Sequence, residues 1–258
     1  MSAKLLNCVI VGQGPDLMVL HPAGLDHSFM GRLIEAAAAT HRVIGVDLRG
    51  HADSPAASSQ TTLSDFVDDV HSVVQAHCAG PARVLGLSFG GMLAQMLALD
   101  HPQDVSALVL CGCGSSFAPE VRPALRARGT LAVDQGMQAV LSSTIERWFN
   151  PTFRLDPQVD RVRERLLSNQ PTNWAAVWNA ISTLDALPRL GQLRLPALVV
   201  AGQEDVATPP AACATLAQAI DGAQLAVLPG APHMMQIESP AAFESVVLAF
   251  LDSLPRSG

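Results

Sequence analysis

The chain lacks the long apolar runs of a membrane protein. Its longest runs, such as residues 107–111, are far shorter than the roughly 20 residues that a membrane-spanning helix needs. Residues 1–8 also lack a charged stretch followed by an apolar one, so we expect no signal peptide. Charged residues make up only 15% of the 258 residues, against 49% apolar residues, which argues against a disordered chain. We therefore expect a cytoplasmic globular protein that forms one large α/β domain.

Basic residues and cysteines are scarce as well. The chain has 16 Lys and Arg residues against 23 Asp and Glu residues, a formal net charge of −7. This balance argues against nucleic acid as a partner, because binding to phosphates requires a basic stripe. The five cysteines form an odd and scattered set, so we expect free thiols. The pair Cys111 and Cys113 is too small a set for a zinc site, and we expect no metal.

What the chain does contain is a regular alternation of short apolar runs and helical patterns. Such an alternation predicts a parallel sheet that is covered by helices on both faces. In sheets of this kind, ligands bind at the carboxyl ends of the strands. Strands are predicted at residues 17–21, 43–47, 83–87, 106–111, 197–201 and 223–228, and helices at residues 29–40, 63–77, 89–99, 211–220 and 241–254.

Residues 116–186 interrupt this alternation with helical patterns and no strand. An all-helical insert between two strands of a parallel sheet predicts a cap over the strand ends. We therefore assign residues 1–115 and 187–258 to the core and residues 116–186 to the cap. The helical patterns of the cap cover residues 121–128, 137–148, 159–169 and 174–183.

The cap contains all three tryptophans, Trp148, Trp174 and Trp178. These rings either line a substrate pocket or pack the core of the cap itself, and the sequence leaves both interpretations open. The cap also holds eight arginines against seven acidic residues, whereas the rest of the chain is acidic. We interpret these arginines mainly as solvated side chains on helix faces.

The most informative motif is a Gly-x-Ser-x-Gly sequence at residues 86–90. It lies between a predicted strand and a predicted helix, which is the context of a nucleophile elbow. In such an elbow a sharp turn exposes the serine hydroxyl, here Oγ of Ser88. A serine is a poor nucleophile at neutral pH and needs a base, which is in turn oriented by a carboxylate.

The other members of a catalytic triad follow in the expected order. On this fold the acid and the histidine come after the serine, at the ends of later strands. Asp205 follows the predicted strand 197–201, with Glu204 as the alternative acid, and His233 follows the predicted strand 223–228. The other seven histidines precede the elbow or lie on or at the end of helices.

The tetrahedral intermediate needs two preorganised donors for its oxyanion. The backbone N–H of Phe89 follows the nucleophile at the positive end of a helix and is the first candidate. The second donor is expected from the loop after the strand 17–21. Pro22 has no N–H, so we predict that Ala23 donates.

Further motifs resemble the α/β-hydrolase superfamily along nearly the whole chain. Residues 47–54, Asp-Leu-Arg-Gly-His-Ala-Asp-Ser, are similar to a turn of that family, with Ala52 in place of the usual glycine. The family's last motif appears at residues 230–233 and 238–240, and Pro22 replaces a glycine of the oxyanion loop. The resemblance implies an α/β-hydrolase fold, that is, a mostly parallel, doubly wound sheet with an inserted helical cap.

The cap segment 146–154 is similar to the cap of 3-oxoadipate enol-lactonases and related carboxylesterases, as are the elbow and residues 201–210. Met96 departs from this pattern, because an aromatic residue is expected there. The resemblance implies a carboxylate-bearing lactone from aromatic catabolism as substrate. On this basis Arg147 or Arg154 is expected to bind the substrate carboxylate. Two more residues, Trp148 and Met234, are expected to contact the substrate.

The expected activity is hydrolysis of an ester or lactone through an acyl-enzyme, with a small molecule as the partner. No cofactor is implied, and the oligomeric state is not predicted. The same triad also serves perhydrolysis, C–C bond hydrolysis and thioester hydrolysis, and the sequence does not separate these reactions. A receptor-like protein that binds a small molecule and turns it over slowly is the remaining alternative. A serine at position 88, instead of aspartate, argues against haloalkane dehalogenase and epoxide hydrolase chemistry.

Overall fold

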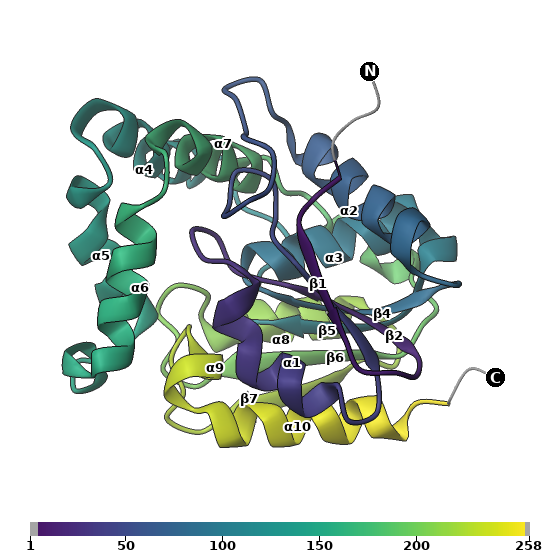
Figure 1. Cartoon of the computed structure of the whole chain (residues 1–258). Helices are drawn as coiled ribbons and strands as arrows, with labels where there is room; N and C mark the ends of the chain where they lie inside the picture. Colours follow the sequence, from purple (N-terminus) through teal and green to yellow (C-terminus); the bar gives the residue numbers. More distant parts are fainter. Residues whose placement is uncertain (1–4, 256–258) are drawn as a thin grey trace.

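The computed structural model describes residues 5–255, and its centre is a seven-stranded sheet (Figure 1). The strand order is β1-β3-β2-β4-β5-β6-β7, and every neighbouring pair is parallel except β1 with β3. This arrangement confirms the predicted mostly parallel, doubly wound sheet. The strands are β1 (Cys8–Val11), β2 (Asp16–Leu20), β3 (Arg42–Val46), β4 (Ala82–Leu87), β5 (Val105–Cys111), β6 (Ala197–Gly202) and β7 (Gln224–Leu228).

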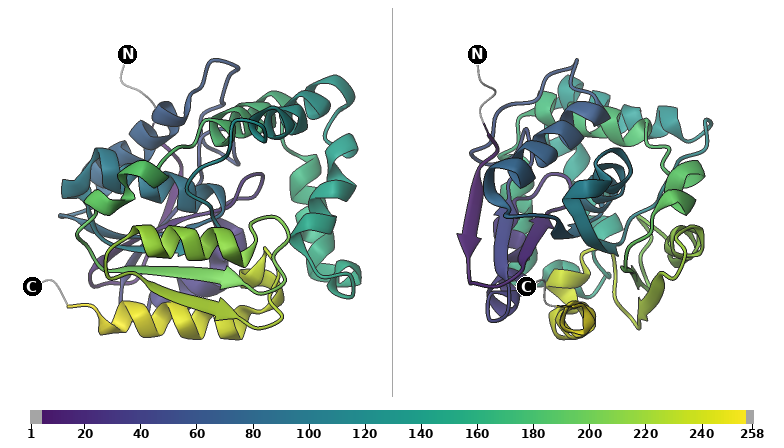
Figure 2. Two further views of the ribbon diagram at one scale, coloured as in Figure 1. Left: turned by 180° about the vertical axis from the view of Figure 1, so that it is seen from behind. Right: turned by 90° about the vertical axis from the view of Figure 1, so that its right-hand side faces the viewer.

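Helices cover both faces of the sheet. Leu17 and Val19 of β2 pack against apolar side chains of α1 and α10, whereas Met18 and Leu20 pack in the cluster that contains α2, α3 and α8. In the rear view of Figure 2, α8 and α10 lie on opposite sides of the last two strands. These helices are α1 (Gly31–Ala37), α2 (Leu63–His77), α3 (Phe89–Asp100), α8 (Pro210–Ala219), the short α9 (Met235–Glu238) and α10 (Pro240–Ser253), with 3-10 turns at η1 (His27–Met30), η2 (Pro102–Asp104) and η4 (Leu187–Gln192).

The local sequence explains where these elements begin and end. Thr62 and Asp65 form a capping box at the start of α2, with reciprocal side-chain to backbone hydrogen bonds. The helix α3 ends before Pro102, which cannot continue it. All six residues of β4 are buried, as expected for a strand that is covered on both faces.

Two elements at the N-terminal side differ from the predictions. The strand β1 is absent from the predictions, because it is a four-residue, half-exposed edge strand with no clear period. The predicted helix 29–40 begins as the 3-10 turn η1 and ends at Ala37. Predicted and observed boundaries of the six other strands differ by one residue at most.

The segment between β5 and β6 is entirely helical and lies beyond the carboxyl ends of the strands (Figures 1 and 2). An antiparallel bridge between Ser116 and Asp185 joins the two ends of this segment at its base. We call residues 116–186 the cap. Its elements are α4 (Arg122–Gln135), α5 (Gln138–Trp148), η3 (Phe153–Leu155), α6 (Pro157–Leu167) and α7 (Pro171–Ser182).

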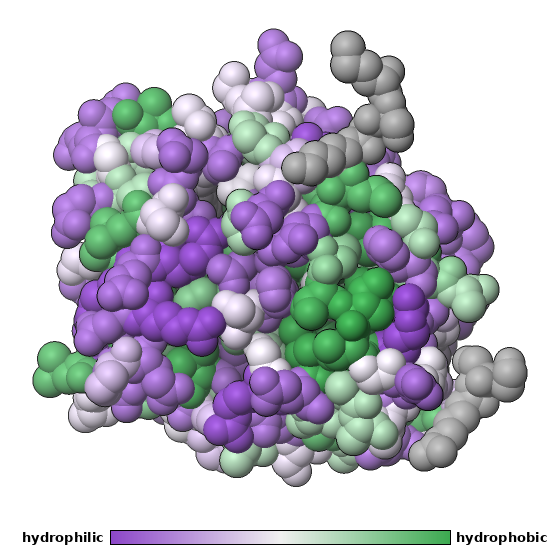
Figure 3. All heavy atoms as spheres, in the orientation of Figure 1, coloured by the Kyte–Doolittle hydropathy of each residue, from purple (hydrophilic) through white to green (hydrophobic). Residues whose placement is uncertain are grey.

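The surface of the cap and the surface of the core differ in polarity. Hydrophilic side chains gather over α5 and α6, whereas an apolar area lies over the sheet edge near β1, where Ile10 is 39% exposed (Figure 3). Within residues 5–255, no helix combines the length and the apolar character that crossing a membrane would require.

Candidate active site

Ser88 lies in a strained turn between β4 and α3. Its φ of 53° and ψ of −114° belong to a region that side chains other than glycine rarely adopt, at a cost of about 1–3 kcal/mol. The backbone N–H of Ser88 donates to Cys111 O over 2.8 Å, which fixes the turn to the end of β5. A Cβ atom at Gly86 would collide with Gly90 O, and one at Gly90 would collide with Leu20 O. The two glycines of the motif are therefore required by the close packing of α3 on the sheet.

The structure brings Ser88, His233 and Asp205 together in one chain of hydrogen bonds. Ser88 Oγ lies 3.0 Å from His233 Nε2, and His233 Nδ1 lies 2.7 Å from Asp205 Oδ2. The side chains of Asp205 and His233 are both almost completely buried. The other carboxylate oxygen, Oδ1, accepts the backbone N–H groups of Ala207 and Thr208, both over 2.8 Å. The carboxylate is thereby held in one orientation toward the imidazole.

The alternative acid, Glu204, has an exposed side chain and takes no part in this chain of hydrogen bonds. Its backbone N–H donates to Ala231 O over 2.9 Å and so joins the loop after β6 to the loop after β7. Gly202 makes this contact close, because a Cβ atom there would lie 2.5 Å from the carbonyl oxygens of Ala231 and Pro232. The two loops position Asp205 and His233 as one unit.

The predicted oxyanion donors lie at the site. Ala23 lines the same cavity as Ser88, and Phe89 is the first residue of α3. Within residues 5–255 no acceptor pairs with the backbone N–H of either residue, so both remain available to a ligand. The neighbouring Gly24, at φ 78°, turns the loop tightly against Trp174 of the cap.

Two histidines that the sequence analysis left without a role hold the loop of Ala23. His51 Nε2 accepts the backbone N–H of Gly24 over 2.8 Å, and His21 Nε2 accepts that of Leu48 over 2.9 Å. Both rings are therefore neutral. Burial lowers the pKa of His21 to about 4 and, with the neighbouring His21, that of His51 to about 3. Their positions after a strand and within the family-like turn were the only sequence signal of this role.

A cavity of about 270 Å³ opens above the nucleophile, beneath the cap. Among the predicted substrate contacts, Arg147 and Trp148 line this cavity. Trp178 lines it as well, whereas Trp174 is 2% exposed and packs within the core, so the tryptophans serve both of the roles left open. The remaining lining residues are mainly apolar and include Met92, Phe117, Val121, Leu125, Ile181 and Ala207.

Two predicted substrate contacts lie elsewhere. Met234 is completely buried, packs in the hydrophobic core and is not among the residues that line the cavity. Arg154 lies outside the cavity, and its guanidinium donates to the carbonyl oxygens of Phe149 and Glu146. The structure therefore places neither Met234 nor Arg154 at the cavity that contains Ser88.

The cap segment that carries Trp148 is bonded directly to the histidine loop. Asn150 donates from Nδ2 to Gly230 O over 2.9 Å and to Glu238 Oε1 over 2.8 Å. Its backbone N–H donates to Glu238 Oε2 over 3.1 Å. The two family-like motifs, in the cap and after His233, thus meet in space and fix one another.

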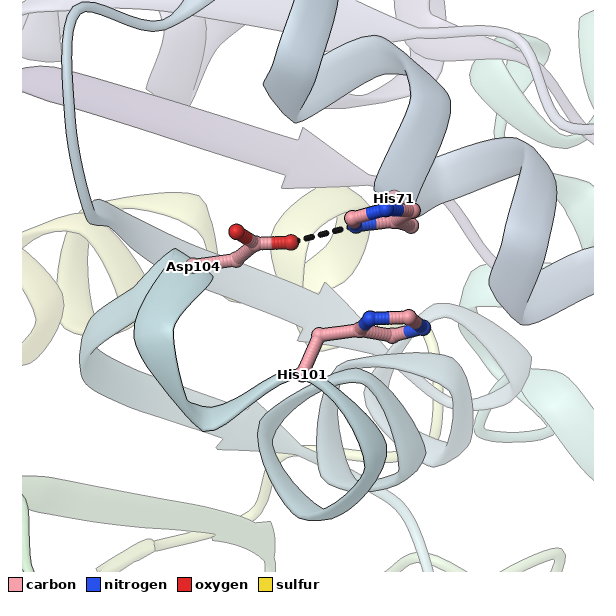
Figure 4. A group of neighbouring side chains, drawn as sticks. All are labelled: His71, His101 and Asp104. Atoms are coloured by element: carbon pink, nitrogen blue, oxygen red, sulfur yellow. Dashed lines mark hydrogen bonds and ion pairs between the residues drawn. The ribbon is translucent and has the colours of Figure 1, made fainter.

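A second cluster of titratable residues lies at the opposite edge of the sheet, where η2 precedes β5 (Figure 4). The rings of His71 and His101 are stacked, with centroids 3.9 Å apart. Asp104 accepts from His71 Nδ1 over 2.5 Å and from Gln75 Nε2 over 2.9 Å. Both carboxylate oxygens of Asp104 thus already accept a hydrogen bond from within the cluster. The cluster lies at the start of β5, whereas Ser88 is bonded to the end of that strand.

The five cysteines are free thiols, as predicted. Burial raises the pKa of Cys111 and Cys113 well above its ordinary value, so neither is a reactive thiolate.

The fold and the Ser-His-Asp geometry are those of a serine hydrolase with an α/β core and a helical cap. A family model described as the alpha/beta hydrolase fold matches residues 16–240. The chain belongs to this family, which confirms the resemblance inferred from the sequence.

Named relatives include both esterases and lactonases. The chain is 32% identical over 231 residues to a pimeloyl-(acyl-carrier protein) methyl ester esterase of Chromobacterium violaceum, covering 86% of this chain and 89% of the relative. It is 27% identical to 3-oxoadipate enol-lactonase 2 of Acinetobacter baylyi, over 95% of this chain and 92% of the relative. The crystal structure of the enol-lactonase from Burkholderia xenovorans LB400 superposes with a TM-score of 0.90 at 29% identity, covering 96% of each chain.

Proposed function

We propose that this protein hydrolyses a carboxylic ester or lactone, with Ser88 as nucleophile, His233 as general base and acid, and Asp205 as the residue that orients His233. The observation that carries the proposal is the chain of hydrogen bonds Ser88 Oγ–His233–Asp205, at 3.0 and 2.7 Å, beside the cavity beneath the cap. These distances are within the reach that proton transfer requires.

In the first half of the reaction, His233 Nε2 takes the proton from Ser88 Oγ as the oxygen attacks the carbonyl carbon. Asp205 keeps Nδ1 protonated and stabilises the imidazolium that forms. The carbonyl oxygen becomes an oxyanion and accepts the free N–H groups of Ala23 and Phe89. His233 then returns the proton to the leaving alcohol, and an acyl-enzyme remains on Ser88.

In the second half, His233 activates a water that attacks the acyl-enzyme through a second tetrahedral intermediate. For a lactone the alcohol stays tethered to the acyl group, so release of the product requires this step. The same two N–H groups stabilise both oxyanions.

Within this activity we propose a small lactone or ester that carries a carboxylate, such as 3-oxoadipate enol-lactone. Support comes from the relatives named as 3-oxoadipate enol-lactonases and from the similar structure named as an enol-lactonase. The cavity of about 270 Å³ is also near the lower limit of small-molecule sites. Because another relative is named as a methyl ester esterase, methyl esters of longer acids belong in the same substrate panel.

The assignment is tested by labelling with a fluorophosphonate probe, which reacts with an activated serine. We expect labelling of the wild type, and of Ser72→Ala as a control on the surface of α2, but none of Ser88→Ala. Hydrolysis of 4-nitrophenyl esters is expected to fall by about three orders of magnitude or more in Ser88→Ala. Labelling that persists in Ser88→Ala would contradict the assignment of the nucleophile.

A further inference from the structure

Two arginines of the cap face the cavity that contains Ser88. Arg128 comes from α4 and Arg147 from α5, and none of the residues that line the cavity is acidic. Arg147 is exposed, and its guanidinium makes one long contact, 3.4 Å from Nη2 to Ala207 O. The cavity thus has a cationic wall on the side of the cap.

Arg128 is held in place by neutral contacts. Its guanidinium carbon lies 4.4 Å from the ring centre of Trp178, and its Nη2 donates to Thr144 Oγ1 over 3.3 Å. Gly129 makes this placement possible, because a Cβ atom there would lie 2.7 Å from Cα of Ala175. The absence of a side chain lets α4 approach α7 closely, and the two helices lie side by side in Figure 1. This approach brings Arg128 over the ring of Trp178.

The charge of Arg128 has no acidic counterpart in the described part of the chain. Arg163 and Arg165, also in the cap, pair with Asp160 and Asp26, each over 2.7 Å. None of the ion pairs among residues 5–255 includes Arg128.

The cap side of the cavity also contains N–H donors that have no hydrogen-bond acceptor in the described chain. Arg128 Nε and Trp178 Nε1 are buried and have no hydrogen-bond acceptor within the described chain. Burial and the neighbouring charge of Arg147 lower the pKa of Arg128 to about 10, so the group stays cationic near neutral pH. A buried cation without an anionic partner is costly, and an anion bound beside it would reduce that cost.

We propose that Arg128, together with Arg147, binds a carboxylate of the substrate at the cap wall, and so selects esters and lactones that carry an acid group remote from the scissile carbonyl. The planar guanidinium matches a carboxylate through two parallel hydrogen bonds. The inference rests on the proposed function, since it defines the substrate class of the same cavity.

The test compares two esters of equal length, mono-4-nitrophenyl glutarate and 4-nitrophenyl valerate, which differ in the terminal carboxylate. For Arg128→Met we expect the ratio of kcat/KM, charged ester over neutral ester, to fall about tenfold or more. Arg128→Lys keeps the charge but not the paired hydrogen bonds, so its ratio should be intermediate. Arg126→Met, an exposed position on the same helix, should keep the ratio of the wild type. A ratio that is the same in Arg128→Met and the wild type would overturn the proposal, as would equal losses on both esters, which indicate a merely structural role.

A second measurement separates this inference from the proposed function. Glutarate binding to Ser88→Ala, measured by calorimetry, needs no turnover, and we expect the added Arg128→Met change to weaken it at least about tenfold. If the wild type hydrolyses neither ester, the proposed function fails, and the calorimetry alone decides on the carboxylate site. Equal affinities for glutarate with and without Arg128, or no binding of glutarate at all, would overturn the proposed carboxylate site.

Discussion

Ser88 and Ala52 are the residues other than glycine that have a positive φ within the described part of the chain, residues 5–255. The strain at Ser88 accompanies the exposure of its hydroxyl at the nucleophile elbow. Ala52, at φ 44°, lies in the turn where the family pattern has glycine. At the scale of single residues, the same backbone feature therefore accompanies a site residue in one case and a departure from the family pattern in the other.

Ala52→Gly is expected to stabilise the protein. The left-handed conformation costs alanine about 1–2 kcal/mol, of which glycine's greater freedom in the unfolded chain offsets about 0.4–1 kcal/mol. The net gain of about 1 kcal/mol should raise Tm by roughly 2–4 °C, measured by calorimetry. Gly50→Ala is the opposite control, because Gly50 has φ 78° and a Cβ atom there would press on Asn173, so its Tm should fall. A lower Tm for Ala52→Gly would show that the turn does not prefer glycine.

The sequence predicted that the side chains of Ser88, Asp205 and His233 meet, and the structure brings them together. The order of Ser88, Asp205 and His233 after three strands was enough to select them, because the carboxyl ends of parallel strands meet at one edge. The prediction of Met234 as a substrate contact did not anticipate its burial away from the cavity. Its neighbour in sequence, His233, contacts Ser88, whereas the side chain of Met234 packs in the core, and no local pattern distinguishes these two directions.

At the scale of elements, the contact between the cap and the histidine loop links two distant segments. Asn150, at the end of α5, donates to both Gly230 O and Glu238 Oε1. This contact holds the loop of His233 from the cap side. On the other side, Gly202 at the end of β6 packs closely against the carbonyl oxygens of Ala231 and Pro232 in the same loop. The loop is thus positioned by both parts of the molecule.

Asn150→Ala is expected to loosen the loop of His233. Two hydrogen bonds are lost, each contributing about 1 kcal/mol, so amide hydrogen exchange in residues 229–238 should accelerate. We also expect kcat for a 4-nitrophenyl ester to fall about three- to tenfold, since small displacements of a catalytic group are costly. Ser142→Ala removes a hydrogen bond to Glu146 on the surface of α5 and serves as the matched control. Unchanged exchange in residues 229–238 would contradict this positioning role.

At the scale of the whole molecule, His21 and His51 make the free energy of unfolding depend on pH. They are neutral acceptors in the folded protein, with pKa values of about 4 and about 3, against 6.5 in an unfolded chain. Between these values the unfolded state binds more protons than the folded state. The folded state therefore loses stability as pH falls from about 6.5 toward 4, by at most about 1.4 kcal/mol per pH unit for each histidine.

His51→Gln tests this coupling, because its amide oxygen still accepts from Gly24 but does not titrate in this range. Urea unfolding at pH 7.5, 6 and 5 should give a smaller decrease in the free energy of unfolding for the variant than for the wild type. Identical slopes in the two proteins would show that His51 is not responsible.

The sequence by itself determined the alternation of strands and helices, the elbow and the order of its partners. These depend on local periodicity, turn residues and chain order, all of which are local properties of the chain. Only the tertiary structure decided which cap residues face Ser88. Arg128 lines the cavity, where the close approach of α4 to α7 at Gly129 places it beside Trp178. Arg154 does not line the cavity, because its guanidinium donates to the carbonyl oxygens of Phe149 and Glu146. Helical spacing alone encodes neither arrangement. The same holds for His21 and His51, whose role comes from hydrogen bonds between segments that are 27 residues apart.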